Sequence, residues 1–149
     1  MSSGFRIAVD GATSSPTHGA VGIVGFIGGQ ATFGFGCALP GIIDATTLEL
    51  LAVRYALLLI SCWGWYDHHV QITGDAQTVW ERLESNTPHD VRCDAIYREV
   101  LYLLTRLPLV SLAYSPREAN RVAHIVARNA LRYPGISNVL FDYSYMVCL

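Results

Sequence analysis

Three carboxylates stand where the chain is expected to change from one structural element to the next. Asp10 ends an alternating apolar segment, Glu49 lies in the first turn of a long apolar helix, and Asp75 ends a second strand-like segment. Strand ends and helix starts of an α/β sheet meet at one edge, which is where sites form. Acidic side chains held together repel one another, so a cluster of these three would imply a bound cation.

Each of these acids also has a purely local explanation. The pair Asp10-Gly11 is a tight-turn signal. The spacing Thr46-x-x-Glu49 is that of a capping box, in which Glu49 would serve the helix start. Asp75 precedes a predicted helix and could cap its first turn. These alternatives stay open for each residue singly, but the three acids together favour a common site.

A helix near the end of the chain carries an unusual polar face. Ser115 can cap it, and Pro116 falls at its first position. Apolar side chains suited to a core recur at a spacing of three and four residues: Ala119, Val122, Ala123, Val126 and Ala130. The other face holds Arg117, Asn120, Arg121, His124 and Arg128. This face is either ordinary solvated surface or a surface that lies along something anionic, with His124 in the middle.

Hydrophobic patterns predict the elements that must position these residues. We expect strands over 5–10, 19–27, 30–38, 69–73 and 109–114, and helices over 46–63, 76–83, 90–106 and 116–131. Short turns join the first three strands, which predicts an antiparallel meander. Helical crossovers precede the later strands, which predicts parallel pairing. The fold class is therefore α/β, with a mixed five-stranded sheet flanked by helices in the order βββαβααβα.

Composition narrows the class of protein. The chain has 149 residues and a formal net charge of −2, so its overall charge does not indicate binding to nucleic acid. Its ten Lys and Arg positions are all arginine. The four cysteines lack the spacing of a zinc site. No secretion signal follows Met1, and the apolar run 55–66 is too short to span a bilayer. We expect one domain over 1–149 in an intracellular, cytoplasmic protein with no membrane partner.

Five short motifs, in this order, resemble those of the ribonuclease H family, type 1, and especially its plant- and retroelement-type branch. They are Ile-Ala-Val-Asp-Gly-Ala at 7–12, Gly-Ala-Val-Gly at 19–22, Leu-Glu-Leu-Leu-Ala-Val at 48–53, Ile-Thr-Gly-Asp-Ala-Gln at 72–77 and Arg-Glu-Ala-Asn-Arg-Val-Ala-His at 117–124. The resemblance covers about residues 5–131. It implies that Asp10, Glu49 and Asp75 bind two divalent ions, Mg²⁺ or Mn²⁺, and hydrolyse the RNA strand of an RNA–DNA hybrid.

The chain departs from the family pattern at the site and around it. His124 stands where the family usually has a fourth acid, and we expect it to act as a weak metal ligand or as an acid/base beside the metals. An imidazole ligand favours Mn²⁺ over Mg²⁺. The catalytic-loop histidine of bacterial relatives is absent, as is a basic protrusion between the second and third helices. Arg117, Asn120 and Arg121 are therefore our candidates for binding substrate, with double-stranded RNA as a second candidate substrate.

Residues 133–149 lie beyond the resemblance. Phe141, Tyr143, Tyr145 and Val147 alternate with less apolar residues, which is the pattern of an extra strand. Such a tail either packs on its own domain or pairs with another chain at a sheet edge and mediates self-association.

Two other functions compete with hybrid cleavage. One is a module that keeps the fold and binds nucleic acid or protein with weakened or lost catalysis, which metal-dependent cleavage would exclude. The other is a different nuclease on the same fold, such as a junction resolvase or a 3′–5′ exonuclease. The exonucleases carry Asp-x-Glu on the first strand, whereas this chain has Asp10-Gly11-Ala12.

Overall fold

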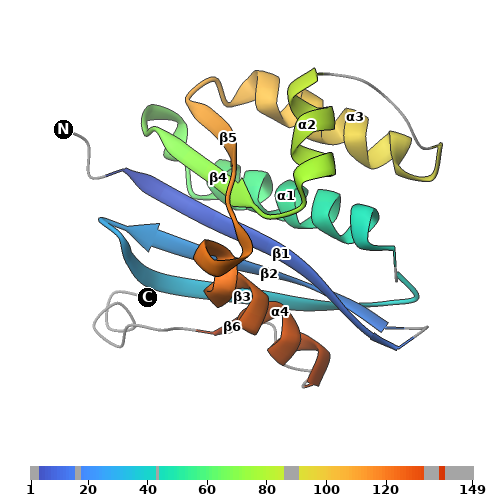
Figure 1. The fold of residues 1–149 in the computed structure, drawn as a ribbon. Helices are drawn as coiled ribbons and strands as arrows, with labels where there is room; N and C mark the ends of the chain where they lie inside the picture. Colours follow the sequence, from blue (N-terminus) through green and yellow to red (C-terminus); the bar gives the residue numbers. More distant parts are fainter. Residues whose placement is uncertain (1–3, 16–17, 43, 86–90, 133–137, 140–149) are drawn as a thin grey trace.

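A single mixed sheet forms the centre of the computed structural model, which describes residues 4–15, 18–42, 44–85, 91–132 and 138–139. The strands lie in the order β5-β4-β1-β2-β3-β6 (Figure 1). β1 pairs antiparallel with β2 and parallel with β4, and β4 pairs parallel with β5. Their bounds are β1 Phe5–Ser15, β2 His18–Ile27, β3 Gln30–Pro40, β4 Val70–Gly74, β5 Val110–Tyr114 and β6 Asn138–Val139.

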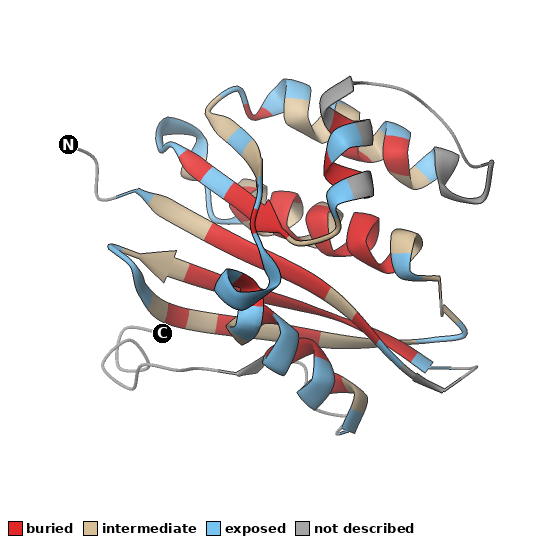
Figure 2. Cartoon of the chain, in the orientation of Figure 1, coloured by how far each residue is buried: buried red, intermediate tan, exposed pale blue. Residues whose placement is uncertain are grey.

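Helices cover both faces of the sheet (Figure 1). On one face α1 (Ala45–Cys62), α2 (Gln77–Ser85) and α3 (Val91–Arg106) enclose the larger core, which includes Ile7 and Val9 of β1. On the other face α4 (Arg121–Arg132) packs on Ala8 and Val24. Two short 3₁₀ helices, η1 (Trp65–Asp67) and η2 (Arg117–Asn120), precede β4 and α4. Figure 2 shows the buried residues concentrated in the central strands and on the inner sides of the helices.

The predicted fold class and the element order βββαβααβα are confirmed, with three local differences. β1 runs on to Ser15, so Asp10-Gly11 is not a turn. The closing helix is split into η2 and α4. A short sixth strand, β6, pairs with β3 at Gly34 and Phe35. The strand predicted over 141–147 lies outside the described residues.

α1 is the core helix of the larger layer. Its apolar side chains, including Leu50, Val53, Leu57 and Ile60, are buried against the sheet and the neighbouring helices. By length and composition alone this helix, unlike the shorter run 55–66, is apolar enough to cross a membrane. Half of the 18 residues of α1 are buried inside the domain, and this burial explains why the helix is so apolar.

Small residues let α4 lie directly on the sheet. A Cβ atom built on Gly22 of β2 would stand 2.5 Å from both the carbonyl oxygen of Ala123 and the backbone nitrogen of Ala127. One built on Gly36 of β3 would lie 3.1 Å from the Cβ atom of Ala130. Gly22 is therefore required for this close approach and Gly36 eases it, which brings the N-terminal half of α4 over the middle of β1.

Candidate active site

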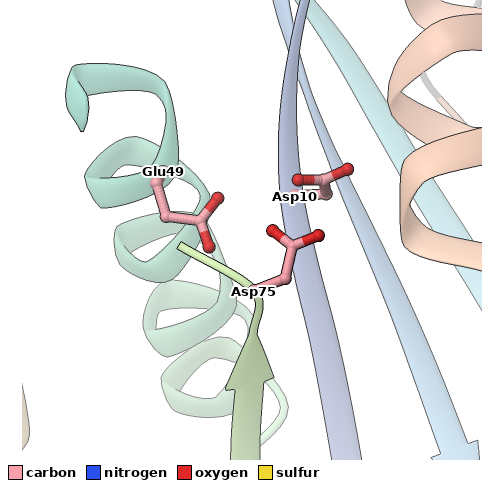
Figure 3. Close-up of side chains that lie close together, drawn as sticks. All are labelled: Asp10, Glu49 and Asp75. Carbon is pink, nitrogen blue, oxygen red and sulfur yellow. The ribbon is translucent and has the colours of Figure 1, made fainter. Parts of the chain in front are cut away.

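The three acids meet where β4 ends beside the middle of β1. Asp10 comes from β1, Glu49 from the first turns of α1, and Asp75 from the residue after β4 (Figure 3). One carboxylate oxygen of each lies within 4.8 Å of one oxygen of the others. In the part of the chain that the structure describes, this is the only group of three or more side chains spaced to share a metal ion.

The structure removes the local explanations for two of these acids. Asp10 pairs with Gly22 in the middle of the β1–β2 ladder, so it has no role in a turn. The N-cap of α1 is Asp44, whose carboxylate accepts hydrogen bonds from the backbone nitrogen and the hydroxyl of Thr47 at 3.1 and 2.7 Å. The predicted capping box of Thr46 and Glu49 is wrong, because Asp44 caps the helix and the side chain of Glu49 is buried.

Gly11 and Gly74 leave the space that the start of α1 and the side chain of Glu49 occupy. A Cβ atom on Gly11 would lie 2.8 Å from the Cβ atom of Leu48, so only glycine lets the start of α1 approach β1 this closely. A Cβ atom on Gly74 would lie 2.5 Å from Oε2 of Glu49 and would collide with the ring of Trp80. Trp80 was not among the predicted site residues. Its position is set by α2 folding back over the end of β4, and the sequence pattern carries no signal for that contact.

Burial makes the charged forms of these acids costly. Burial, followed by the charges of Asp10 and Asp75, raises the pKa of Glu49 to about 8. Burial and the Asp75 charge also raise the pKa of Asp10, against the lowering effect of its hydrogen bond with His124. Oε2 of Glu49 is fully buried and has no hydrogen-bond partner among the described residues. A cation beside that oxygen would relieve the repulsion, so these residues fit a divalent metal ion.

His124 contacts one member of the cluster. Its Nδ1 lies 2.8 Å from Oδ2 of Asp10, and its half-exposed ring faces solvent on the outer side. His124 is not part of the three-carboxylate group. Its predicted role as a metal ligand stays a prediction, and the contact that the structure adds is a hydrogen bond that orients Asp10.

The arginines of the polar face are exposed, as expected. Nε of Arg117 lies 3.8 Å from Oδ2 of Asp75, although the Arg117 side chain is 86% exposed. Arg121 and Arg128 are exposed on α4. Arg117 thus stands at the margin of the acidic cluster with most of its guanidinium open to a ligand.

The prediction that Asn120 contacts substrate needs correction. Asn120 is fully buried, and its Nδ2 donates a hydrogen bond to the carbonyl oxygen of Val9 at 2.9 Å. Asn120 ends the 3₁₀ turn of η2, where it is buried against β1 while Arg117 and Ala119 of the same turn are exposed. Ser115 is not a cap either: it is buried, its backbone nitrogen bonds to the Gly74 carbonyl oxygen, and Pro116 precedes η2 without a side-chain cap.

Most of the chain matches the model of a known protein family. The family model described as "Reverse transcriptase-like" matches residues 8–130. No protein of curated function matches the sequence significantly.

Solved structures resemble the whole fold. RNase H1 of the halophilic archaeon Halobacterium salinarum is 25% identical with a TM-score of 0.76, over 87% of this chain and 98% of that one. LC11-RNase H1, isolated from compost by a metagenomic approach and solved with an RNA/DNA hybrid, is 15% identical with a TM-score of 0.79, over 89% and 99%. The N-terminal RNase H domain of a Mycobacterium tuberculosis protein is 15% identical with a TM-score of 0.74, over 88% and 95%.

Proposed function

Because this chain belongs to the ribonuclease H family, we propose that it is a metal-dependent endonuclease that hydrolyses the RNA strand of RNA–DNA hybrids. The observation that carries the proposal is the convergence of Asp10, Glu49 and Asp75 within 4.8 Å of one another. Three buried or half-buried acids with an unpartnered oxygen are unfavourable without a cation. The same three carboxylates would supply the ligands for two bound cations.

Asp10, Glu49 and Asp75 would hold two divalent ions, Mg²⁺ or Mn²⁺. When bound, such ions stabilise both the attacking water and the leaving oxygen of a phosphodiester hydrolysis. The protein's own part is to keep the carboxylates in place and ionised. Glu49 gives up the proton that burial favours, and the hydrogen bond from His124 fixes Oδ2 of Asp10 so that its second oxygen is left for a cation.

Exposed arginines beside the site suit a nucleic-acid backbone. The guanidinium of Arg117 lies next to Asp75, and Arg121 follows one turn later on the exposed side of α4. A planar guanidinium forms paired hydrogen bonds with phosphate oxygens. A hybrid would be recognised by its A-like shape and 2′-hydroxyl groups rather than by base sequence, and double-stranded RNA shares that shape.

A cleavage assay tests the proposal. End-labelled RNA–DNA hybrid, double-stranded RNA and double-stranded DNA are incubated with the protein in Mg²⁺, in Mn²⁺ or in chelator. We expect RNA cleavage in the hybrid that requires a divalent ion. Asp10→Asn should abolish cleavage without unfolding the protein, whereas Asp67→Asn, a matched change of an exposed acid on η1, should retain it.

The outcomes separate the competing functions. Tight binding of the hybrid by the parent protein without cleavage in either metal would identify a binding module. Cleavage of double-stranded DNA alone would point to another nuclease of this fold. If Asp10→Asn cleaves as well as the parent, the acidic cluster is not the active site.

A further inference from the structure

A row of polar side chains crosses the sheet on the face that carries α4. In the strand register Arg6 of β1 pairs with Phe26 of β2 on one side and with Gln71 of β4 on the other, and Gln71 pairs with Ser111 of β5. Directly paired residues of neighbouring strands point to the same face of a sheet. Arg6, Gln71 and Ser111 therefore form one line of hydrogen-bonding groups across three strands.

This part of the face is open. α4 covers β1, β2 and β3, and its core contacts reach Ala8 and Val24 rather than β4 or β5. Gln71 and Ser111 are exposed, as the pale blue positions on β4 and β5 in Figure 2 show. In the next row on the same face, Ala8 lies under α4 and Thr73 is buried, whereas Ala113 on β5 is partly exposed.

Arg6 is held in place without a counter-charge. Its guanidinium lies 4.0 Å from the centroid of the Phe26 ring, and its Nη1 donates a hydrogen bond to Oγ1 of Thr73 at 3.2 Å. Among the described residues no carboxylate forms an ion pair with it. Burial lowers the pKa of Arg6, which reflects a charge that has lost water without gaining an anion. A cation in that state is ready to bind an anionic ligand.

The row lies on the same face of the sheet as Asp10 of the candidate active site. Arg6 and Asp10 are four residues apart on β1, which corresponds to about 13 Å along the strand. One strand of double-stranded DNA rises about 3.4 Å per nucleotide along its axis, and on that scale the separation corresponds to roughly four nucleotides. The exposed arginines Arg117 and Arg121 lie on η2 and α4, which follow β5 on this face.

We propose that Arg6, Gln71 and Ser111 form a second phosphate-binding site, which holds the backbone of the nucleic-acid substrate a few nucleotides beyond the point of cleavage. The proposal rests on the proposed function, since it extends the same substrate along the protein. A guanidinium flanked by an amide and a hydroxyl supplies hydrogen-bond donors for phosphate oxygens, and the row contains no acid that would repel them. These residues carry no sequence preference, because backbone contacts set position and not specificity.

The test measures binding as a function of salt in chelator, where cleavage does not interfere. Full-length parent, Arg6→Lys, Arg6→Gln and Arg6→Glu are titrated with a labelled hybrid. We expect Arg6→Gln to weaken binding about threefold to tenfold at low salt and to reduce the salt slope by about one. Arg6→Lys should keep the slope, and Arg6→Glu should weaken binding further. Arg106→Gln, which changes an exposed arginine on α3, is the matched control and should bind as the parent does.

A cleavage map gives a second, position-dependent result. On an end-labelled hybrid, Arg6→Gln should reduce cleavage where about four or more base pairs extend beyond the cut on one side, and leave cuts nearer that end unchanged. The double change Gln71→Ala with Ser111→Ala, which alters only exposed side chains, should show the same dependence. The double variant therefore tests the proposed phosphate-binding site even if the Arg6 variants are poorly folded.

Three results would overturn the proposal. If binding and salt slope are unchanged in Arg6→Gln and in the double variant while the parent cleaves hybrid, the row does not bind substrate and the proposed function stands. If cleavage falls equally at every position, the effect is on the fold. If the parent itself neither binds nor cleaves hybrid, the proposed function fails together with this site.

Discussion

The side-chain amide of Asn120 donates a hydrogen bond to the carbonyl oxygen of Val9, and Val9 is the residue before Asp10. The parallel ladder between β1 and β4 ends one residue earlier, at Ala8 and Thr73. Asn120 thus binds the first carbonyl of β1 beyond the last pair of that ladder. The contact ties η2 to β1 at the point where β1 and β4 part to hold Asp10 and Asp75.

This contact predicts that Asn120 positions the site. Asn120→Ala leaves the buried Val9 carbonyl without a partner and should lower the free energy of unfolding by about 1–3 kcal/mol. It should also raise the metal concentration needed for half-maximal cleavage, because Asp10 is held less firmly. Asn129→Ala, an exposed asparagine of α4, is the control and should change neither quantity. An Asn120→Ala protein that loses stability but keeps the parent's metal dependence would limit the role of Asn120 to the fold.

Glu49 predicts how metal-free stability depends on pH. Its pKa of about 8 in the folded protein exceeds the ordinary value of 4.5, so the folded state keeps a proton that the unfolded state releases between these values. The free energy of unfolding therefore falls as pH rises from about 4.5 to about 8, by at most about 1.4 kcal/mol per pH unit from this group. Glu49→Gln should remove most of that slope and be more stable than the parent at pH 8 in chelator. Denaturant unfolding at several pH values measures this.

Glu49→Gln also distinguishes the repulsion among the three carboxylates from the binding of a metal ion by Glu49. Adding Mg²⁺ or Mn²⁺ should stabilise the parent much more than Glu49→Gln, because a ligand that binds only the folded state stabilises it. Glu81→Gln, an exposed acid on α2, should behave like the parent throughout. Equal metal stabilisation of parent and Glu49→Gln would show that Glu49 does not hold the ion.

His124 predicts two different results according to its role. As a metal ligand it should make Mn²⁺ a better activator than Mg²⁺, and His124→Asp should shift the preference toward Mg²⁺. If His124 contacts only Asp10, removal of its side chain should raise the pKa of Asp10, because the hydrogen bond with His124 lowers that pKa. In that case His124→Ala and His124→Asp should keep the parent's metal preference. The ratio of Mn²⁺- to Mg²⁺-supported rates in the three proteins distinguishes the roles.

Arg117 and Arg121 should contribute unequally to catalysis. Either change to Ala should weaken hybrid binding at low salt and reduce the salt slope by about one. Arg117→Ala should also reduce the cleavage rate at saturating substrate, because Arg117 on η2 lies beside Asp75, whereas Arg121 follows at the start of α4. Fluorescence binding and single-turnover cleavage measure the two effects. A salt slope unchanged in both variants would identify this face as ordinary solvated surface.

The sequence by itself determined the succession of elements and the three acids. Apolar periods of two and of three to four residues are local properties, so β1, β2, β3, α1, β4 and the later elements could be located along the chain. Topological rules then placed the ends of β1 and β4 at one edge of the sheet, together with the start of α1. Asp10, Glu49 and Asp75 could be predicted to meet because the pattern placed each at one of these points, and they do meet although β1 continues past Asp10 to Ser15.

Only the tertiary structure decided how the surrounding side chains are used. Asp44 rather than Thr46 caps α1, Asn120 at the end of η2 is buried against β1, and α1 and α4 pack closely on β1 and β2. Gly11, Gly22 and Gly74 permit that packing, but a glycine alone does not reveal which atom will approach it. The line from Arg6 to Ser111 depends on the register of strands far apart in the sequence. Register and close packing follow from contacts between distant residues, and for that reason no local pattern contains them.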